Sequence, residues 1–168
     1  MKMKTLLAAG CAAMLATAGL ADDHKVKVGM ITTLSGGGAG LGIDVRDGFL
    51  LAAKMAGNDN LEIVVEDDQR KPDIAVQLAD KMIQSEKVDV LTGIIWSNLA
   101  MAVVPAATAQ GKFYLSPNAG PSALAGRMCH ENYFNVAYQN DNLHGAMGAW
   151  MREQGYEAPI LMAPNYPA

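Results

Sequence analysis

A tryptophan, a serine and an asparagine follow one another where an apolar run ends, so their side chains could bind a small molecule. The run is 91–95 and the three residues are Trp96, Ser97 and Asn98. The hydroxyl, the amide and the backbone N–H groups that open the next helix could hold a carboxylate, while the indole could enclose an apolar or aromatic group. The alternative is structural: Trp96 belongs to the core and Asn98 only caps the helix.

A second polar group, Glu66, Asp67 and Asp68, could supply paired carboxylates for acid–base or metal chemistry. Charged residues that hold the N-terminus of the following helix are the commoner explanation. The three histidines are scattered and no serine lies in a Gly-x-Ser-x-Gly turn. We therefore predict no enzyme and no metal site; a hydrolase that uses these carboxylates or Ser97 is the weakest hypothesis.

The glycine-rich loop at 36–42 resembles a dinucleotide-binding turn, but its spacing does not match one. The third glycine position falls on Leu41 or on Ile43, depending on the starting glycine, and no Gly-Lys-Ser/Thr follows. We therefore expect no phosphate cofactor. The loop either lines a cleft or is a purely structural turn, and we expect it to be too rich in glycine to be helical.

Apolar periodicity predicts strands that alternate with helices. The strands are expected at 26–33, 61–67, 88–95, 112–115, 133–137 and 159–163, and the helices at 43–56, 72–86, 99–110 and 142–154, the last capped by Asn142. Such alternation predicts an α/β fold: a flavodoxin-like parallel-sheet lobe with helices on both faces. The loops at 35–41 and 96–98 would then flank the switch point between the first and third strands, where ligands bind.

The first 21 residues form a predicted signal peptide, with Lys2 and Lys4 before an apolar stretch and small residues before Asp22. Cys11 follows a lipobox-like stretch, although a cysteine inside the apolar stretch is the simpler interpretation. Export leaves Cys129 as a lone cysteine. Removal of the two lysines changes the net charge from −4 to −6, which argues against binding to nucleic acid or to an anionic membrane.

These residues and motifs resemble the type I periplasmic binding proteins, specifically the leucine/isoleucine/valine-binding family that serves ABC transporters. The resemblance spans the mature segment. It rests on the order and spacing of these short stretches: Val26-Lys27-Val28-Gly29, Leu34-Ser35-Gly36, Glu66-Asp67-Asp68 with Lys71-Pro72, Thr92-Gly93 before Trp96-Ser97, and Ser116-Pro117. It implies two α/β lobes that close on a ligand, with 22–140 an incomplete first lobe and 141–168 the start of a truncated second one.

The resemblance also implies roles for individual residues. Ser97 matches the family's serine that holds the polar head of an amino acid, and Tyr166 matches an aromatic residue that caps the ligand. Leu41 takes the place of a pocket aromatic. The loop after Ser116-Pro117 adds further ligand contacts, and it carries Asn118, Ala119 and Gly120.

The expected function is therefore an exported, periplasmic solute-binding protein that delivers an amino acid or a related small carboxylate or amide to ABC transporter permease subunits. It would need no cofactor and no stable membrane insertion. A ligand-sensing receptor domain of the same fold is the alternative.

Overall fold

The computed structural model describes residues 25–57 and 59–166, and five parallel strands form its sheet. The strands are β1 (Val26–Thr32), β2 (Leu61–Asp67), β3 (Val90–Thr92), β4 (Phe113–Ser116) and β5 (Tyr133–Asn135). Their order across the sheet is β2-β1-β3-β4-β5. This is the predicted flavodoxin-like order, with the switch point between β1 and β3.

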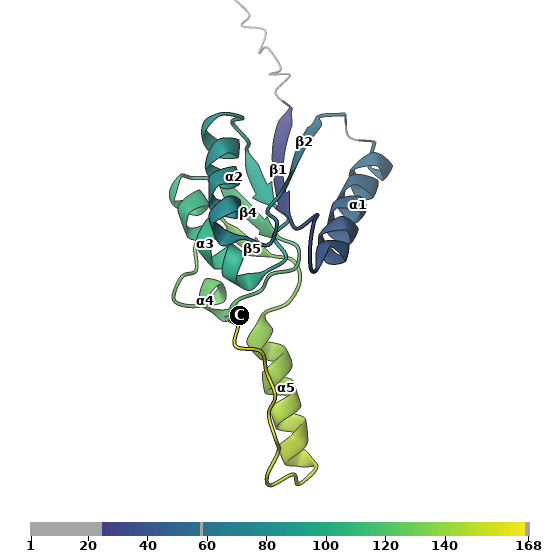
Figure 1. The fold of residues 1–168 in the computed structure, drawn as a ribbon, viewed down its shortest axis with the longest axis vertical. Helices are drawn as coiled ribbons and strands as arrows, with labels where there is room; N and C mark the ends of the chain where they lie inside the picture. Colours follow the sequence, from purple (N-terminus) through teal and green to yellow (C-terminus); the bar gives the residue numbers. More distant parts are fainter. Residues whose placement is uncertain (1–24, 58, 167–168) are drawn as a thin grey trace, which may run out of the picture.

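Helices cover both faces of the sheet, as the alternating pattern predicts. They are α1 (Ala39–Met55), α2 (Pro72–Gln84), α3 (Ser97–Ala109), the short α4 (Ser122–Ala125) and α5 (Asn140–Glu153). Figure 1 shows α2 and α3 together on one side of the strands and α1 on the other. Right-handed crossovers produce this arrangement because the chain moves outward from β1 in opposite directions along the sheet.

The hydrophobic core lies between the sheet and the pair α2 and α3. Fully buried side chains from the strands, such as Leu91 and Tyr114, meet Met82 from α2 and Leu99 from α3. Helix α1 contributes much less, since Gly42 is its one buried residue. The core therefore holds β3 and the start of α3 more firmly than it holds α1.

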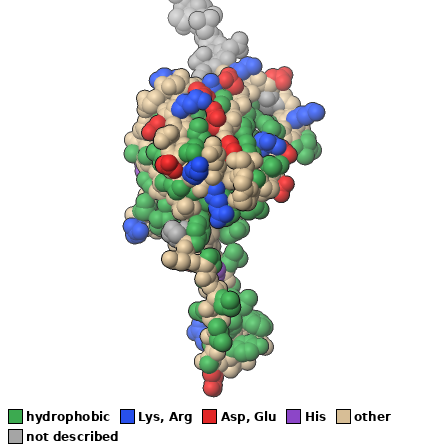
Figure 2. Space-filling model, in the orientation of Figure 1, with side chains coloured by type: hydrophobic (Ala, Val, Ile, Leu, Met, Phe, Trp, Pro, Cys, Tyr) green, Lys and Arg blue, Asp and Glu red, His purple; other side chains and the backbone are tan. Residues whose placement is uncertain are grey.

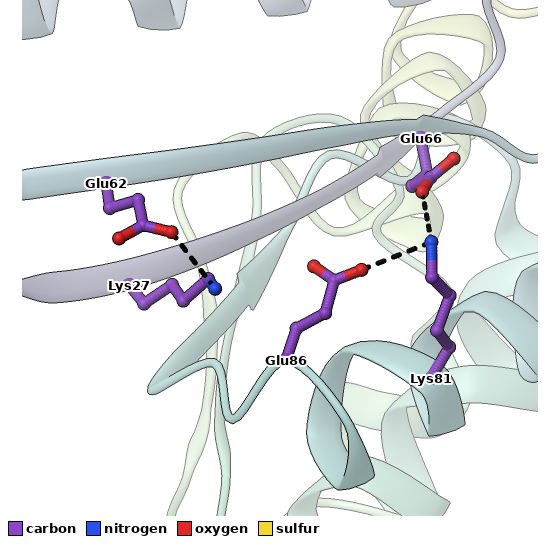
Figure 3. A network of polar contacts seen from close by, with 5 residues as sticks. All are labelled: Lys27, Glu62, Glu66, Lys81 and Glu86. Atoms are coloured by element: carbon purple, nitrogen blue, oxygen red, sulfur yellow. Dashed lines mark hydrogen bonds and ion pairs between the residues drawn. The ribbon is translucent and has the colours of Figure 1, made fainter.

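Ion pairs tie the outer strand to its neighbours at the surface. Lys81 lies 2.6 Å from Glu66 and 3.1 Å from Glu86, and Lys27 lies 3.0 Å from Glu62 (Figure 3). These side chains are solvent-accessible, so each pair contributes little to stability. Glu62 and Glu66 thus connect β2 to β1 and to α2.

The largest differences from the predicted element boundaries are at the start of α1 and at the end of β3. Helix α1 begins at Ala39, inside the glycine loop that we expected to be non-helical, because Gly38 takes a left-handed conformation and starts the helix there. Strand β3 ends at Thr92 rather than at residue 95, because Gly93 has a φ of 105° and turns the chain out of the sheet. The apolar run continues because Ile94 and Ile95 are buried after the strand ends.

Two predictions for residues after 139 are wrong. Residues 159–163 form no strand, and Ile160, Leu161 and Met162 are 90%, 84% and 94% exposed. The five-stranded sheet of the described residues ends at β2 and β5, and neither strand pairs with this segment. The cap of α5 is Gln139, whose side chain accepts a hydrogen bond from the Asn142 backbone N–H, so Asn142 lies inside the helix.

Helix α5 extends away from the sheet, and the segment after it runs back alongside (Figure 1). None of its residues is buried, and its apolar side chains gather on this projection (Figure 2). Phe113 and Phe134 on β4 and β5 are also exposed, with their rings 6.3 Å apart. The predicted signal peptide and Cys11 lie outside the described residues.

Candidate functional site

The carboxyl ends of the five strands meet at one edge of the sheet because all strand pairs are parallel. At this edge the turn at 93–96 leaves β3, and it is flanked by Thr33 after β1 and by Asn118 after β4. Gly93 is required in this turn, because a Cβ atom there would lie 2.7 Å from the Ile31 carbonyl oxygen. The predicted binding turn therefore lies at the switch point.

The indole of Trp96 is held by a chain of hydrogen bonds. Its Nε1 donates to Thr33 Oγ1 at 2.9 Å, and the Thr33 hydroxyl donates to Asp68 Oδ1 at 2.6 Å. The ring is partly buried and also packs against the core, which is the part of the structural interpretation that the fold supports. Asn98 is the second residue of α3 and not its cap, which is Trp96.

Arg70 covers the indole. The central carbon of its guanidinium lies 3.9 Å from the centroid of the Trp96 ring, a distance at which a cation is attracted to the ring. Arg70 Nη1 donates to the Gly37 carbonyl at 3.4 Å. Gly38 lies against the ring edge, where a Cβ atom would come within 2.3 Å of Trp96 Cζ2. The loops after β1, β2 and β3 therefore meet around one indole.

The turn between β2 and α2 is built by two carboxylates. Gln69 and Arg70 have φ values of 51° and 59°, a left-handed conformation that costs energy in residues other than glycine. Asp67 Oδ1 accepts from the Gln69 N–H at 2.9 Å, and Asp68 Oδ1 accepts from the Arg70 N–H at 2.8 Å. Asp67 also accepts from the Leu34 N–H at 2.8 Å. The acidic residues hold this turn rather than the helix N-terminus itself.

The two carboxylates are shifted in opposite directions. Burial raises the pKa of Asp68, and the hydrogen bonds from Thr33 and Arg70 offset only part of that effect, to which the nearby charge of Asp67 adds. Partial burial also raises the pKa of Asp67, but the Ser35 hydroxyl and the N–H groups of Leu34, Gln69 and Ser35 together lower it below its ordinary value. The surroundings therefore favour the charged form more strongly at Asp67 than at Asp68.

Replacing Asp67 by asparagine should destabilise the protein by about 1 kcal/mol at neutral pH, because hydrogen bonds to a charged group are weakened. The pKa of Asp67 in the fold lies below its ordinary value of 3.8, so its stabilisation is present above that pH and lost as the pH falls through the folded pKa. Urea unfolding at pH 7 and at pH 3 measures the difference. Asp80→Asn, at an exposed position on α2, is the control, and an Asp67→Asn deficit that is unchanged at low pH would contradict this account.

Ser97 lies at the first position of α3 and is 6% exposed. Its Oγ accepts a hydrogen bond from Asn140 Nδ2 at 3.2 Å, and the Asn140 N–H donates to the Gly120 carbonyl at 2.9 Å. Gly120 is itself tightly enclosed, since a Cβ atom there would lie 1.8 Å from the Tyr138 carbonyl oxygen. The structure thus links Ser97 and Gly120 through the first residue of α5.

Of the other predicted residues, Asn118 and Tyr166 contact the Trp96 turn, whereas Ala119 and Leu41 make no hydrogen bond to it in the structure described. Asn118 donates from Nδ2 to the Ile95 carbonyl at 2.9 Å, and the Asn98 N–H donates to the Tyr166 hydroxyl at 3.3 Å, so both Asn118 and Tyr166 reach the Trp96 turn. Ala119 is buried, and its carbonyl accepts from the Ser116 hydroxyl. Leu41 is 49% exposed on the first turn of α1.

Sequence reasoning did not identify Thr33, Arg70 or Asn140 as parts of this site. Asn140 and Thr33 are recognisable only once the strand order is known. The position of Arg70 in a turn could have been predicted locally. It follows a strand that ends in two adjacent aspartates, and this pattern favours a tight turn before the next helix.

Within 25–57 and 59–166, no group of three or more His, Cys, Asp or Glu side chains is placed to hold a metal ion. In the same ranges, no helix is long and apolar enough to cross a membrane. A cavity of about 410 Å³ lies between α5 and residues 161–163, and its lining includes Met147, Met151 and Leu161. None of the predicted site residues lines it.

The fold is similar to that of several solved solute-binding proteins. A protein from Rhodopseudomonas palustris in complex with benzoate is 35% identical, with a TM-score of 0.73 over 77% of this chain and 37% of that one. Another from the same species, in complex with 3,4-dihydroxybenzoic acid, is 26% identical, with a TM-score of 0.71 over 78% and 37%. A leucine-binding protein from Thermotoga maritima shares the fold at 22% identity, with a TM-score of 0.69 over 77% and 37%.

The chain thus spans a little over a third of the length of these solved proteins. No curated protein matches it. The family model described as periplasmic binding protein matches residues 25–168. Because that match takes in most of the sequence, and the parallel sheet agrees with the similar structures, the chain belongs to the periplasmic binding protein family.

Proposed function

We propose that this chain is part of an exported solute-binding protein that captures a small carboxylate in a cleft between two lobes and delivers it to the permease subunits of an ABC transporter. The observation that carries the proposal is the position of the Trp96 turn, at the switch point of a lobe of this family. Residues 22–140 would form an incomplete first lobe and 141–168 would begin the second. The signal peptide at 1–21 would direct the protein to the periplasm.

The turn supplies donors for a carboxylate. Ser97 and Asn98 open a helix of 13 residues, whose first N–H groups are free of intrahelical partners and carry partial positive charge. The Tyr166 hydroxyl already lies against the Asn98 N–H, so an aromatic side chain from beyond α5 reaches the same turn. A ligand that bound both segments would stabilise a closed arrangement of the two lobes.

Two ligand classes fit such a site, amino acids and aromatic carboxylates. The similar structures with identities of 35% and 26% hold benzoate and 3,4-dihydroxybenzoic acid, and Trp96 offers an aromatic surface beside the donors of α3. These points favour an aromatic carboxylate over an aliphatic amino acid. Leu41, Asn118, Ala119 and Gly120 would then shape the pocket rather than bind the charge.

Calorimetric titration of the protein expressed from its complete gene with benzoate, leucine and benzamide tests the proposal. Binding of benzoate or leucine supports it, whereas the absence of heat with every carboxylate and amino acid tried would overturn it. Ser97→Ala should weaken binding by about 1–3 kcal/mol, because the hydroxyl contacts a charged group.

The control for Ser97 is Asn140→Ala, which removes the donor to Ser97 Oγ but leaves the hydroxyl in place. We expect Asn140→Ala to affect affinity much less than Ser97→Ala. Equal losses in the two variants would show that Ser97 acts by anchoring α5 and not by binding the ligand.

A further inference from the structure

We propose that Arg70, held against Trp96, binds the carboxylate of the ligand and makes the site selective for anions that lack an ammonium group. This inference rests on the proposed function and goes further, because it assigns the charge-binding residue and the ligand class. Three features of Arg70 support it: the unused donors of its guanidinium, the fixed geometry of its turn, and the positive charge at the strand-end edge.

The guanidinium of Arg70 has donors to spare. Arginine carries five N–H donors, and with the residues that the structure describes this guanidinium makes one hydrogen bond, the contact of 3.4 Å with the Gly37 carbonyl. Among the residues that the structure describes, no carboxylate lies within ion-pair distance of it. Lys27, Arg46 and Lys81 pair with carboxylates, and what distinguishes Arg70 from the other cations is its contact with Trp96 at the strand-end edge. Arg70 is thus a cation at the binding edge whose counter-ion is not supplied by these residues.

The position of Arg70 is fixed from two sides. Its backbone is held in the left-handed conformation by the hydrogen bond to Asp68 Oδ1, and its guanidinium rests on the indole. The same Asp68 oxygen accepts the Thr33 hydroxyl that orients the indole. One carboxylate therefore places both the cation and the ring beneath it, and little entropy remains to be lost when an anion binds.

This arrangement discriminates between ligand charges. A guanidinium can donate two parallel hydrogen bonds to a carboxylate. The Trp96 indole, on which the guanidinium rests, provides a flat apolar surface for the ring of a planar ligand. An amino acid brings an ammonium group next to its carboxylate, and Arg70 would repel that group. A benzoate-type anion brings only negative charge and a ring.

The test compares Arg70→Gln, which removes the charge, with Arg70→Lys, which keeps a charge but loses the planar pair of donors. Lys54→Gln is the matched control for loss of one positive charge, because Lys54 lies in the last turn of α1, at the opposite end of that helix from Gly38. Each variant of the protein expressed from its complete gene is titrated with benzoate, benzamide and leucine. Circular dichroism melting verifies that each variant is folded.

We expect Arg70→Gln to raise the Kd for benzoate by about 10- to 100-fold, since a hydrogen-bonded charge is lost, and to change the Kd for benzamide by less than about 2-fold. Arg70→Lys should fall between wild type and Arg70→Gln, and Lys54→Gln should match wild type. Benzoate should also alter tryptophan fluorescence, and the change should be lost in Trp96→Phe but kept in Trp150→Phe.

Three results would overturn the inference and leave the proposed function standing. They are a wild-type affinity for benzoate in Arg70→Gln, an equal loss of benzoate and benzamide binding in that variant, and a wild-type preference for leucine over benzoate. A wild-type protein that binds none of the carboxylates would instead overturn the proposed function. The two failures are therefore distinguishable.

Discussion

Replacing Gly42 by alanine is expected to destabilise the protein by about 3 kcal/mol, because the added methyl group has no space and its neighbours cannot move. A Cβ atom at this position would lie 2.0 Å from the Thr33 carbonyl oxygen and 2.9 Å from Thr32 Oγ1. The first contact is with backbone that leaves β1 and leads into the site loop. Helix α1 would have to shift away from the strand, so the loop at 36–38 would move with it.

Gly48→Ala is the matched control, because Gly48 lies in the same helix and a Cβ atom there would meet nothing within 4 Å. Alanine is the better helix former, so this variant should gain up to about 1 kcal/mol. Urea unfolding followed by circular dichroism gives both values. If the two variants differed by less than about 1 kcal/mol, the close contact between α1 and β1 would not exist in solution.

Asp68→Ala is expected to cost about 3 kcal/mol, because it leaves two buried or partly buried donors without an acceptor. Asp68 is fully buried, and its Oδ1 accepts from both the Thr33 hydroxyl and the Arg70 N–H. Without the hydrogen bonds to Asp68 Oδ1, the backbone strain at Gln69 and Arg70 is no longer offset, so the turn between β2 and α2 becomes less stable. The indole of Trp96 would lose its fixed orientation at the same time.

Asp68→Asn separates the acceptor from the charge. The asparagine amide oxygen can replace Oδ1, and among the described residues Asp68 Oδ2 has no hydrogen-bond partner, so the loss should be less than half of that in Asp68→Ala. Urea unfolding measures the stability, and the near-ultraviolet circular dichroism of tryptophan reports the ring. A loss in Asp68→Asn as large as in Asp68→Ala would show that the negative charge, rather than the acceptor, holds the turn.

The fold could be predicted because its signals are local and periodic. Apolar runs in 61–67 and 88–95, with amphipathic stretches between strands, are enough to indicate a parallel sheet. The start of α1 was missed because glycine weakens helix propensity, whereas here Gly42 is required by contact with Thr33. A strand at 159–163 was predicted from apolarity alone, which does not supply the neighbouring strand that a ladder needs.

The candidate site was only partly visible in the sequence. Trp96, Ser97 and Asn98 are adjacent in the chain and follow a buried run, so they could be selected without a structure. Arg70 and Thr33 reach the same ring from 26 and 63 positions away in sequence, in the contacts with Trp96. Contacts of this kind depend on strand order and on a turn conformation that residue types do not specify.

The sparse packing of α1 has a consequence for how the lobe unfolds locally. A helix of 17 residues with one buried residue opens at a lower free energy than α2 and α3, which share the core. Its first turn is joined to the site through Gly37 and Gly38, which touch Arg70 and Trp96. An anion bound to Arg70 would therefore slow amide hydrogen exchange along α1, so that part of the binding free energy is used to order a helix that meets the pocket only at its first turn.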